Sequence, residues 1–552
     1  MNNTLLQNIF ANAIAILVKD TPNADLQDLD IFFDIPKNTE HGDLATNICM
    51  RLAKPLASNP RAIAEKLIPL LQYDNSIIER ISLAGAGFIN IKFANKYYHN
   101  ILADIHQQGK DFGKTNGGSG KSVNVEYVSA NPTGLLHLGH GRNAAIGDTL
   151  ANLYEWTGWK VTREYYFNNA GNQMTNLTKS IYARMMQICK EPEFAFPEDG
   201  YHGEYVKLIA QELIDKYGET LLAETDDNMA TIKKFGEEWC FNKIKHTLKR
   251  MNINQDTFFN EDSLYKDGKI KQVLAELKEK GLSYEKDGAV WLALSKMGLT
   301  DDRVIVKSSG EPTYRLPDIA YHREKLLRNY DLVVDLFGSD HIATVPDVLA
   351  GVKALGLDDK KVKVVIHQFV TLTENGEQVK MSKRTGKSYT LDELLDDVGE
   401  DIVRFFLIMR GVNTHLEFDL SLAKEQSDKN PVFYLQYGYA RICSIFDKLP
   451  DANIDYSKAN LSLLTDESEI ALIKQLSRFP ESILTASNKS EPHILCEYLR
   501  EVASAFHLFY HNCRIIIDDA ELMKARLHLA NVTRIALHNG LSILGVSAPE
   551  KM

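Results

Sequence analysis

One stretch of the chain organises the rest of it: Val123-Asn-Val-Glu-Tyr-Val-Ser-Ala-Asn-Pro-Thr-Gly-Leu-Leu-His-Leu-Gly-His-Gly-Arg-Asn143. Residues 123–128 are apolar-rich, with β-branched side chains at both ends, which predicts a buried strand. Residues 131–134 predict a turn, and the apolar spacing over 139–156 predicts a helix. A strand, a turn and a helix in this order open a nucleotide-binding βαβ unit, in which phosphates lie over the start of the helix.

Two histidines mark the start of that helix. His137 and His140 are three residues apart, so their imidazoles can point the same way and can both hydrogen-bond phosphate oxygens. Gly139 lacks the side chain that would block a close approach. By itself the pattern also fits a turn with two surface histidines, so the rest of the chain has to distinguish the two interpretations.

The composition predicts a soluble globular protein. The chain has 552 residues, of which 44% are hydrophobic and 25% are charged, enough for roughly three or four domains. With 63 basic and 74 acidic residues, the formal net charge is −11. The charge of the whole chain therefore gives no support for nucleic-acid binding, and any such surface must be a local patch.

The six cysteines are scattered and form no CxxC pair. This usage predicts reduced thiols and a cytoplasmic protein, without a structural zinc site or a disulfide framework. No stretch is long and apolar enough to span a bilayer. Residues 5–18 have apolar residues at helical spacing and no basic start, so they predict an amphipathic helix and not a signal peptide.

The expected fold class is multidomain α/β, and the chain begins with an α+β domain over residues 1–118. Its helices are expected at 4–19, 42–56 and 60–72, and its strands at 77–83 and 87–93. Residues 114–120 are rich in Gly, Ser and Asn, which predicts a linker to the next domain.

Residues 119–425 predict a Rossmann-like domain with a doubly wound parallel sheet. After the opening βα unit, strands are expected at 160–167, 331–337 and 362–366. Residues from about 190 to 295 are charged and mostly helical, which predicts an insertion between the halves of this domain. Residues 426–552 predict an all-α domain, with helices at 431–448, 466–485, 491–513 and 519–545.

A second signature lies far downstream, in Glu377-Gln-Val-Lys-Met-Ser-Lys-Arg-Thr-Gly-Lys387. It follows a hairpin-like segment at 371–376, and its basic residues sit on a Gly- and Ser-containing loop that is suited to grip a polyphosphate. Lysine ammonium groups there would stabilise charge on the β- and γ-phosphates while the α-phosphorus is attacked. A solvated basic loop is the alternative, but the combination with the histidine pair favours adenylate-forming chemistry.

With both signatures in hand, the chain resembles the class I aminoacyl-tRNA synthetases, whose paired signatures have the forms HIGH and KMSKS. The closer similarity is to the arginyl-tRNA synthetases of the bacterial type, and it covers the full length. The matching motifs run in order along the chain: Glu40-His-Gly-Asp43, Gly87-Phe-Ile-Asn-Ile91, Glu126 to Arg142, Tyr165-Tyr-Phe-Asn-Asn-Ala-Gly-Asn-Gln173, Leu316-Pro-Asp-Ile-Ala-Tyr-His322, Val379-Lys-Met-Ser-Lys-Arg-Thr-Gly-Lys387, Asn430-Pro-Val-Phe-Tyr-Leu-Gln-Tyr437 and Ala548-Pro-Glu-Lys-Met552.

The resemblance implies a reaction and assigns residues to it. L-arginine would be activated with ATP to arginyl-adenylate and transferred to the 3′ end of tRNA(Arg), giving AMP and pyrophosphate. The implied catalytic residues are His137, His140, Lys380 and Lys383. The implied arginine-binding residues are Glu126, Ser129, Ala130, Asn131, Tyr314 and Asp318. The implied ATP-binding residues are Thr133, Gly134, His137, Gly139, His140, Met381, Ser382 and Lys383.

The expected arginine pocket also makes chemical sense. A guanidinium is planar, permanently charged and carries five donors, so its pocket needs carboxylates and aromatic faces. Glu126, Asp318 and Tyr314 supply these groups. The chain departs from the family pattern at two positions. Asn169 replaces a common aspartate. The family's glutamine has no clear match near residues 338–341, which leaves open whether Ser339, Asp340 or His341 substitutes for it.

Further expectations follow from the resemblance. Mg²⁺ would accompany the nucleotide without a metal site of the protein's own. Residues 1–118 would contact tRNA, and residues 426–552 would bind the anticodon. The protein would be a monomer. Near the start of the C-terminal domain, aromatic and arginine side chains could stack on anticodon bases, although each also fits a helix core: Tyr434, Tyr437, Tyr439 and Arg441.

Three alternatives remain at this point. Another class I synthetase would need either a much larger inserted domain or clustered zinc ligands. A small-molecule nucleotidyltransferase would not need the first and last domains. A non-catalytic tRNA-binding paralogue would not need both signatures intact. Pyrophosphate exchange with ATP and arginine, with and without tRNA, separates the three.

Overall fold

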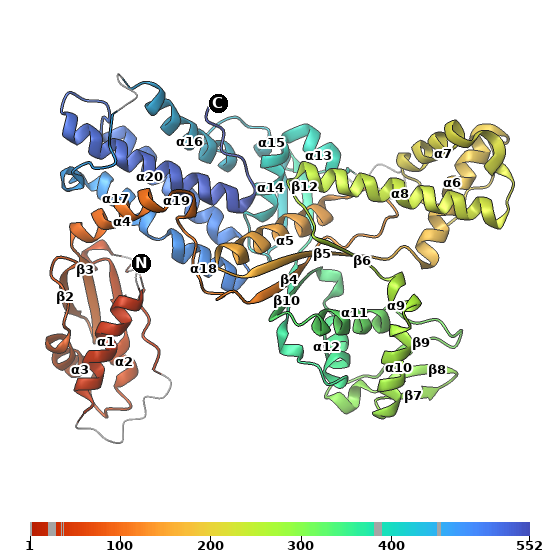
Figure 1. Ribbon diagram of the computed structural model, residues 1–552, viewed down its shortest axis with the longest axis horizontal. Helices are drawn as coiled ribbons and strands as arrows, with labels where there is room; N and C mark the ends of the chain where they lie inside the picture. The colour runs from red at the N-terminus through yellow and green to blue at the C-terminus, as the bar shows by residue number, and fades with distance from the viewer. Residues whose placement is uncertain (1–2, 20–28, 35, 37, 380–388, 450–453) are drawn as a thin grey trace.

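The computed structural model describes residues 3–19, 29–34, 36, 38–379, 389–449 and 454–552. The molecule is elongated, with the N-terminal and C-terminal domains at one side, the parallel sheet at the centre and helices α6–α8 at the opposite end (Figure 1). Within these residues, no helix is both long and apolar enough to cross a membrane.

A parallel sheet forms the centre of the molecule and confirms the predicted doubly wound fold. Among the described residues its strand order is β11-β10-β4-β5-β6, and every neighbouring pair is parallel. The strands are β4 (Ser122–Glu126), β5 (Lys160–Phe167), β6 (Thr257–Asn260), β10 (Leu332–Gly338) and β11 (Val362–His367). The order reverses beside β4, and ligands bind at such a reversal, outside the carboxyl ends of the strands.

Helix α5 (Leu138–Trp156) crosses the sheet directly after β4 and is buried on nearly every side. Small residues make this close packing possible. A Cβ added to Gly147 would lie 2.3 Å from the Tyr127 ring, and one added to Gly141 would lie 2.8 Å from Leu391. Because its small residues let α5 pack this closely, the sequence of α5 sets the position of its N-terminus relative to the end of β4.

The region predicted as one insertion, about 190–295, is divided by a strand of the central sheet. Helices α6 (Gly171–Cys189), α7 (Glu204–Tyr217) and α8 (Asp226–Arg250) form a bundle with its own core, and β6 then returns to the sheet. β6 has only four residues, which is too short for a periodicity signal.

After β6 comes a second small unit, in the lower right of Figure 1. An antiparallel sheet pairs β8 with both β7 and β9, and helices cover it. Its elements are α9 (Asp262–Lys266), α10 (Lys269–Glu279), β7 (Ser283–Lys286), β8 (Ala289–Leu292), β9 (Arg303–Val306), α11 (Arg315–Leu327) and α12 (Val345–Ala354).

The hairpin expected at 371–376 is present. β12 (Val370–Glu374) pairs with β13 (Glu377–Gln378) and, on its other side, with β14 (Leu416–Asp419). The helices α13 (Leu391–Val398), α14 (Glu400–Ile408) and α15 (Leu420–Ala423) connect this small sheet to the C-terminal domain.

The N-terminal domain packs α1 (Asn3–Leu17), α2 (Ile48–Leu52) and α3 (Pro60–Leu67) beside an antiparallel sheet of β1 (Leu44–Thr46), β3 (Phe88–Phe93) and β2 (Ile78–Ala84). The helix predicted at 42–56 was wrong in its first half, where residues 44–46 form β1 and α2 begins only at Ile48. Thr46 separates the two parts, because its hydroxyl accepts from the backbone N–H of Ile48 at 3.2 Å and starts α2.

The C-terminal domain is helical, as expected, and comprises α16 (Pro431–Asp447), α17 (Glu467–Ser477), α18 (Phe479–Lys489), α19 (His493–Asn512) and α20 (Ala520–Leu544). The helix predicted at 466–485 is two helices, because Pro480 lacks an N–H and lies in the first turn of α18. Helix α4 (Asn95–Gln108) joins the terminal domains: the Asn539 amide on α20 donates to the Gly109 carbonyl at 3.0 Å.

Candidate active site

The histidine pair lies at the N-terminus of α5, above the carboxyl end of the sheet. His137 is the N-cap: its Nδ1 accepts from the Gly139 N–H at 3.1 Å, and its own N–H donates to His140 Nδ1 at 3.4 Å. The two rings stack with centroids 3.8 Å apart. This is a capping box built from histidines, which uses backbone donors to hold both rings in place.

His140 is neutral at physiological pH. Burial lowers its pKa to about 3, and the neighbouring His137 and His367 contribute to the shift. Because Nδ1 accepts a backbone N–H, the proton of the neutral ring is on Nε2. His140 therefore offers a hydrogen-bond donor and no charge, and the positive end of the helix dipole supplies the attraction for an anion.

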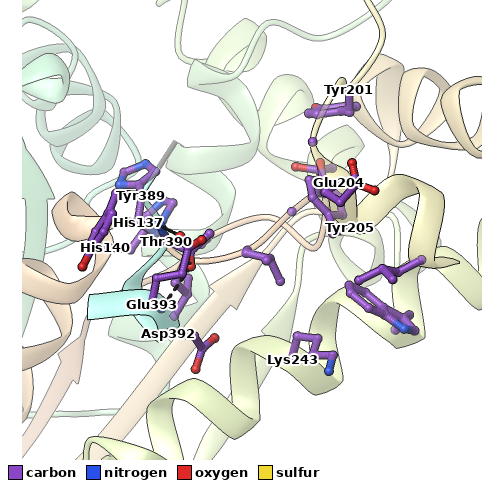
Figure 2. A pocket seen from close by; sticks show the side chains of 18 of the residues that line it. His137, His140, Tyr201, Glu204, Tyr205, Lys243, Tyr389, Thr390, Asp392 and Glu393 are labelled. Atoms are coloured by element: carbon purple, nitrogen blue, oxygen red, sulfur yellow. Dashed lines mark hydrogen bonds between the residues drawn. The ribbon is translucent and has the colours of Figure 1, made fainter. Parts of the chain in front are cut away.

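A large cavity opens in front of the pair (Figure 2). Its volume is about 1460 Å³, and its walls include residues predicted to bind ATP or arginine: Ala130, Asn131, Thr133, Gly134, His137 and His140. The opposite wall comes from the α6–α8 bundle and is aromatic and basic: Tyr201, Tyr205, Trp239, Lys243, His246 and Arg250. Tyr205 connects the two walls, because its hydroxyl donates to the Thr133 carbonyl at 2.7 Å.

Of the second signature, Lys380, Met381, Ser382 and Lys383 lie outside the described residues. The residues on either side of this gap, Val379 and Tyr389, both line the cavity that contains the histidines. The backbone N–H of Leu391 donates to the Leu136 carbonyl at 2.8 Å. The segments just before and just after the second signature therefore lie beside the first signature.

The predicted arginine-binding loop follows β4 in a strained conformation. Val128 and Ser129 have φ of 70° and 45°, which non-glycine residues adopt at a cost of about 1–3 kcal/mol each. Asn143 compensates by accepting from the Val128 N–H at 2.6 Å. The Ser129 hydroxyl donates to Glu126 at 2.8 Å.

The motif at 165–173 holds the next two residues of the loop. The Ala130 carbonyl accepts from the Tyr165 hydroxyl at 2.7 Å. The Asn131 side chain accepts from the Asn168 N–H at 3.0 Å and donates to Gln173 at 2.9 Å. Two motifs that are distant in sequence therefore form one rigid wall. Asn169, which replaces a family aspartate, points elsewhere and donates to Glu237 at 2.8 Å.

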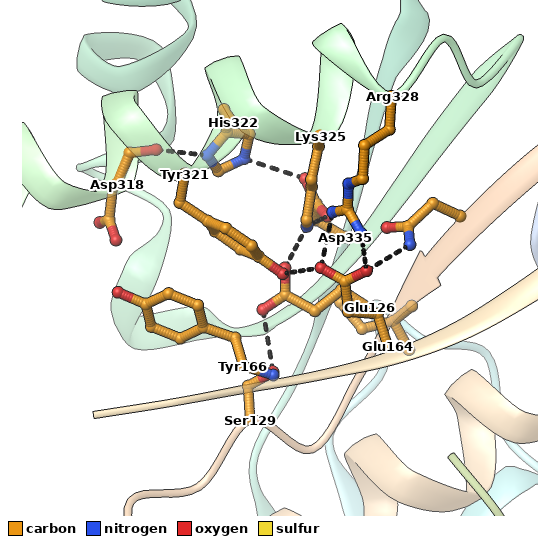
Figure 3. A network of polar contacts seen from close by, with 12 residues as sticks. Glu126, Ser129, Glu164, Tyr166, Asp318, Tyr321, His322, Lys325, Arg328 and Asp335 are labelled. Atoms are coloured by element: carbon orange, nitrogen blue, oxygen red, sulfur yellow. Dashed lines mark hydrogen bonds and ion pairs between the residues drawn. The ribbon is translucent and has the colours of Figure 1, made fainter. Parts of the chain in front are cut away.

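Asp318, on α11, has an unusual carboxyl group. No hydrogen bond or ion pair to its carboxylate exists among the described residues, and Figure 3 shows it pointing away from the network around it. The pKa of Asp318 is raised to about 7, mainly by burial; Glu261 and Glu126 contribute to the rise, and His322 and Lys325 oppose it. A carboxylate in this state is suited to receive a cation.

Glu126 lies at the end of β4 and is buried, but it already has a cation (Figure 3). Lys325 is fully buried and contacts both Glu126 and Asp335, the latter at 2.5 Å. Asp335 also lies 3.0 Å from His322. Burial lowers the pKa of Lys325, but Asp335 and Glu126 more than offset this effect and raise it, so the lysine stays charged.

A second buried charge cluster lies beside the first. Glu164 on β5 accepts from Arg328 at 2.6 and 2.8 Å, from Tyr321 at 2.7 Å and from Asn124 at 2.9 Å. Sequence reasoning missed Lys325, Asp335 and Glu164. The sequence did contain a signal for them. Glu164 and Asp335 lie in the middle of predicted strands, and Lys325 lies on an apolar helix face. A charged residue at such a buried position requires a partner of opposite charge.

The remaining predicted residues are not among those that line the cavity in front of the histidines. Tyr314 precedes α11 and is 59% exposed, with the Arg315 guanidinium 5.0 Å above its ring. After β10, Asp340 and His341 are exposed, and His341 stacks on Phe337. The Ser339 hydroxyl is buried and has no hydrogen-bond partner within the described part of the chain.

At the start of the C-terminal domain only part of the predicted aromatic set reaches the surface. Tyr439 is buried, while Tyr437 is 40% exposed. Arg441 donates to the Tyr437 hydroxyl at 2.6 Å, and its guanidinium lies over the rings of Tyr437 and Tyr510 at 4.5 and 5.0 Å. Tyr434 is half-buried against His507.

No group of three or more His, Cys, Asp or Glu side chains that could hold a metal ion occurs in the part of the chain that the structure describes. The carboxylates that line the cavity near the histidines have other partners. Asp392 accepts from Thr247 at 2.6 Å, and Glu393 accepts from the Thr390 N–H at 2.6 Å as part of a capping box.

Comparison with known proteins gives a consistent result. Family models match three consecutive segments: the arginyl tRNA synthetase N-terminal domain over residues 4–93, the class I (R) tRNA synthetase catalytic domain over 100–408, and the DALR anticodon-binding domain over 435–552. The chain is 48% identical to a protein of Salinibacter ruber named arginine--tRNA ligase, covering 95% of this chain and 96% of that protein. It is also 48% identical to the arginine--tRNA ligase of Desulfotalea psychrophila, covering 94% of each.

Solved structures resemble the whole molecule. A Campylobacter jejuni structure described as an arginyl-tRNA synthetase superposes with a TM-score of 0.77 at 30% identity, over 83% of this chain and 99% of that one. The arginyl-tRNA synthetase of Thermus thermophilus superposes over the full length of both chains, also with a TM-score of 0.77, at 21% identity. At that identity the second superposition shows a shared fold.

Proposed function

The chain belongs to the arginyl-tRNA synthetase family, and from this premise we propose that the cavity at the start of α5 activates L-arginine with ATP and transfers it to the 3′ end of tRNA(Arg). The observation that carries this proposal is the shared cavity: the histidine pair and both flanks of the lysine signature line it.

The first step joins arginine to the nucleotide. A carboxylate oxygen of arginine attacks the α-phosphorus in line, a new P–O bond forms, and the bond to the β-phosphate breaks with its electron pair leaving on pyrophosphate. The protein supplies no nucleophile, so positioning and charge stabilisation lower the barrier. His137 and His140 donate to phosphate oxygens from the helix start, while Lys380 and Lys383 neutralise the leaving pyrophosphate.

The second step transfers the activated arginine. A ribose hydroxyl of the terminal adenosine, the 2′-OH in class I enzymes, attacks the carbonyl carbon, and AMP leaves. The aromatic and basic wall formed by α6–α8 supports this assignment, because unpaired bases stack on aromatic rings and phosphates pair with Lys and Arg. Stacked Tyr205 and Trp239 and the neighbouring Lys243 offer both kinds of group.

The amino acid is held from both ends. Asn131 and the backbone of Ser129 and Ala130 bind its α-amino and carboxylate groups. Asp318 receives the guanidinium; the unpartnered state of its carboxylate supports this role. Glu126 can join it even while it contacts Lys325, because each carboxylate oxygen has two lone pairs. Tyr314 packs on the substrate once the pocket is filled.

The nucleotide brings Mg²⁺ with it. The carboxylates near the histidines are already bonded to other protein groups, so the ion would be held mainly by phosphate oxygens and water, as Mg²⁺ prefers. Thr133, Gly134 and Gly139 leave room for the nucleotide, and the family resemblance assigns Met381, Ser382 and Lys383 to its binding.

The other domains bind the rest of the tRNA. Residues 1–118 contact its body and residues 426–552 its anticodon, with exposed Tyr437 and Arg441 as candidate stacking groups. The contact between the end of α4 and α20 holds the first and last domains together, so they can present one continuous surface; the protein acts as a monomer in this proposal. All six cysteines are free thiols, which agrees with a cytoplasmic location.

Exchange of radioactive pyrophosphate into ATP tests the proposal. It should require arginine, and comparison with and without tRNA(Arg) shows whether activation needs tRNA. Exchange driven by another amino acid, or the absence of exchange under both conditions, would refute the proposed reaction.

A further inference from the structure

Helix α8 belongs to two hydrophobic cores at once. Its first part contributes Ile232 and Cys240 to the core of the α6–α8 bundle, and its last turns contribute Ile244 and Leu248 to the main core of the molecule. With 25 residues, the helix is about 37 Å long at 1.5 Å per residue. It is therefore a continuous rod that connects the bundle wall of the cavity to the rest of the catalytic domain.

The end of this rod carries an arginine that faces three carboxylates. Arg250 is the last residue of α8, and its guanidinium lies 3.3 Å from Asp392, 2.8 Å from Asp396 and 3.0 Å from Glu400. Its Nε also donates to Glu400 at 3.1 Å. The carboxylates belong to α13 and to the first residue of α14, so one guanidinium joins α8 to both helices.

One of the three carboxylates has a second bond to α8. The other oxygen of Asp392 accepts from the Thr247 hydroxyl at 2.6 Å, and Thr247 is buried. Figure 2 shows Asp392 beside the helix that carries Lys243. Thr247 and Arg250 are three residues apart and lie on the same face of α8. Together they hold the first turn of α13.

The same turn of α13 is bonded to the segment that carries the histidine pair. The backbone N–H of Leu391 donates to the Leu136 carbonyl at 2.8 Å, and Thr390 forms an isolated antiparallel bridge with His137. Thr390 is also the N-cap of α13, where it forms a capping box with Glu393. A displacement of this turn would therefore move the backbone beside His137.

The three carboxylates depend on Arg250 for neutralisation. Asp392 and Asp396 are four residues apart on α13, a spacing at which like charges repel, and Glu400 adds a third negative charge. In the described part of the chain, no other cation forms an ion pair with any of them. Without Arg250, the repulsion among them would favour a movement of α13 and α14 away from α8.

We propose that Arg250 is a positioning residue for adenylate formation, which holds the first turn of α13, and with it the backbone beside the histidine pair, against the end of α8. The inference rests on the proposed function, since it concerns the geometry of that reaction. The competing interpretation is that Arg250, which also lines the cavity, binds a phosphate directly. Its three partners argue against this, because they engage its nitrogens and would repel a phosphate.

The first test removes the guanidinium. For Arg250→Gln, the maximal rate of pyrophosphate exchange at saturating ATP, arginine and tRNA(Arg) should fall by about tenfold, because small displacements slow a reaction that depends on positioning. The KM for arginine should stay within about twofold of the wild-type value. Lys249→Gln is the matched control, since Lys249 is exposed on the same turn and forms no ion pair among the described residues. Equal rate losses in both variants would overturn the inference.

Glu400→Gln distinguishes positioning from direct phosphate binding. Glu400 is exposed at the start of α14 and does not line the cavity. If Arg250 acts through its carboxylate partners, the exchange rate should fall by about twofold to threefold, since an exposed partner contributes little. The double variant Arg250→Gln/Glu400→Gln should be no slower than Arg250→Gln alone. If Arg250 binds phosphate, Glu400→Gln would instead free it, and an unchanged rate with a lower KM for ATP or tRNA(Arg) would overturn the inference.

A charge exchange completes the test. Arg250→Glu brings four carboxylates together, so the exchange rate should fall by about a hundredfold. Adding Glu400→Arg restores a cation between α8 and α14 and should bring the rate back to within about fivefold of the wild type. A phosphate contact would not recover, because position 250 stays negative.

Circular dichroism shows whether each variant is folded. A folded double variant that remains as slow as Arg250→Glu would overturn the inference. Glu400→Gln, at an exposed position, still decides between the two interpretations if the variants of Arg250 do not fold. A wild-type enzyme without arginine-dependent exchange would refute the proposed function instead.

Discussion

Arg142, on the first turns of α5, donates from its buried guanidinium to the carbonyl of Gln368 at 2.8 Å, directly before the strand β12 that leads to the lysine signature. The same guanidinium donates to the carbonyls of Thr414 at 2.9 Å and Gly411 at 3.0 Å. Burial lowers the pKa of Arg142 to about 10, so it remains charged at neutral pH. This arginine therefore joins the start of α5, which carries the histidine pair, to the segment that leads to the lysine signature.

We therefore expect Arg142→Lys to slow adenylate formation. An ammonium lacks the planar fork, so β12 loses part of its anchor. The maximal rate of pyrophosphate exchange should fall by about tenfold to a hundredfold, with a smaller change in the KM for arginine. Arg404→Lys is the control: Arg404 is equally buried, contacts Asp148 and donates to the Leu544 and Met251 carbonyls at 2.5 and 2.7 Å, so none of these contacts holds β12 or the loop before it. Equal rate losses in both variants would contradict a positioning role for Arg142.

Asp318→Asn should raise the KM for arginine steeply, by about a hundredfold or more, because the substrate loses its unpaired anionic partner. The KM for ATP should stay within about twofold of the wild-type value, since the histidine pair and the helix start are untouched. Steady-state aminoacylation with varied arginine measures the effect. An unchanged arginine requirement would remove Asp318 from the pocket.

The affinity for arginine should depend on pH. The pKa of Asp318 is raised to about 7, so below that pH the carboxyl is protonated and a cation must displace the proton. The KM for arginine should therefore fall as the pH rises from about 6 to about 8, by up to about tenfold per unit, and then level off. Asp318→Asn should flatten this profile, and a KM that rises with pH in the wild type would have the wrong sign.

His140 should contribute no ionisation to the rate near neutrality. Its pKa is lowered to about 3, so it acts as a neutral donor from about pH 5 upward. His140→Ala should reduce the exchange rate by about a hundredfold to a thousandfold, the size expected for losing a donor to a developing charge. Changing exposed His511 to Ala should have no effect. An inflection of kcat near pH 6 that disappears in His140→Ala would contradict the neutral state.

Tyr437→Ala should weaken tRNA binding without altering the arginine site. Stacking of a base on an aromatic side chain contributes about 1–3 kcal/mol, so the KM for tRNA(Arg) should rise by about tenfold. The KM for arginine at saturating tRNA should not change. Leu508→Ala, at another exposed position of the C-terminal domain, is the control; equal effects of both substitutions would argue against base stacking by Tyr437.

Much of the architecture could be predicted from local patterns. The strands β4, β5, β10 and β11 are rich in β-branched and aromatic residues, and α5 follows a Gly- and Pro-containing turn, so their type and order could be predicted. β6 could not be predicted, because four residues are too few to show a hydrophobic periodicity. β1 was mistaken for part of a helix, because its three residues directly precede a true helix. Pro480 was the available signal for the break between α17 and α18. The break was missed because the helical periodicity of the apolar residues continues almost unchanged across it.

The site, too, has features that the sequence could predict and features that it could not. The family resemblance predicts His137, His140, Glu126 and Asp318 as residues of one site. It could not show that Glu126 already contacts Lys325 or that Asp318 stands without a partner, because those facts depend on pairs 199 residues apart that only the packed sheet brings together.

By itself, the sequence determined which elements form and which side chains can bind phosphate or guanidinium, since strand, turn, cap and donor chemistry are properties of neighbouring residues. Only the tertiary structure decided which carboxylates are neutralised internally and which await a ligand. Burial and charge pairing set that balance, and both arise from contacts between elements that are distant in the chain.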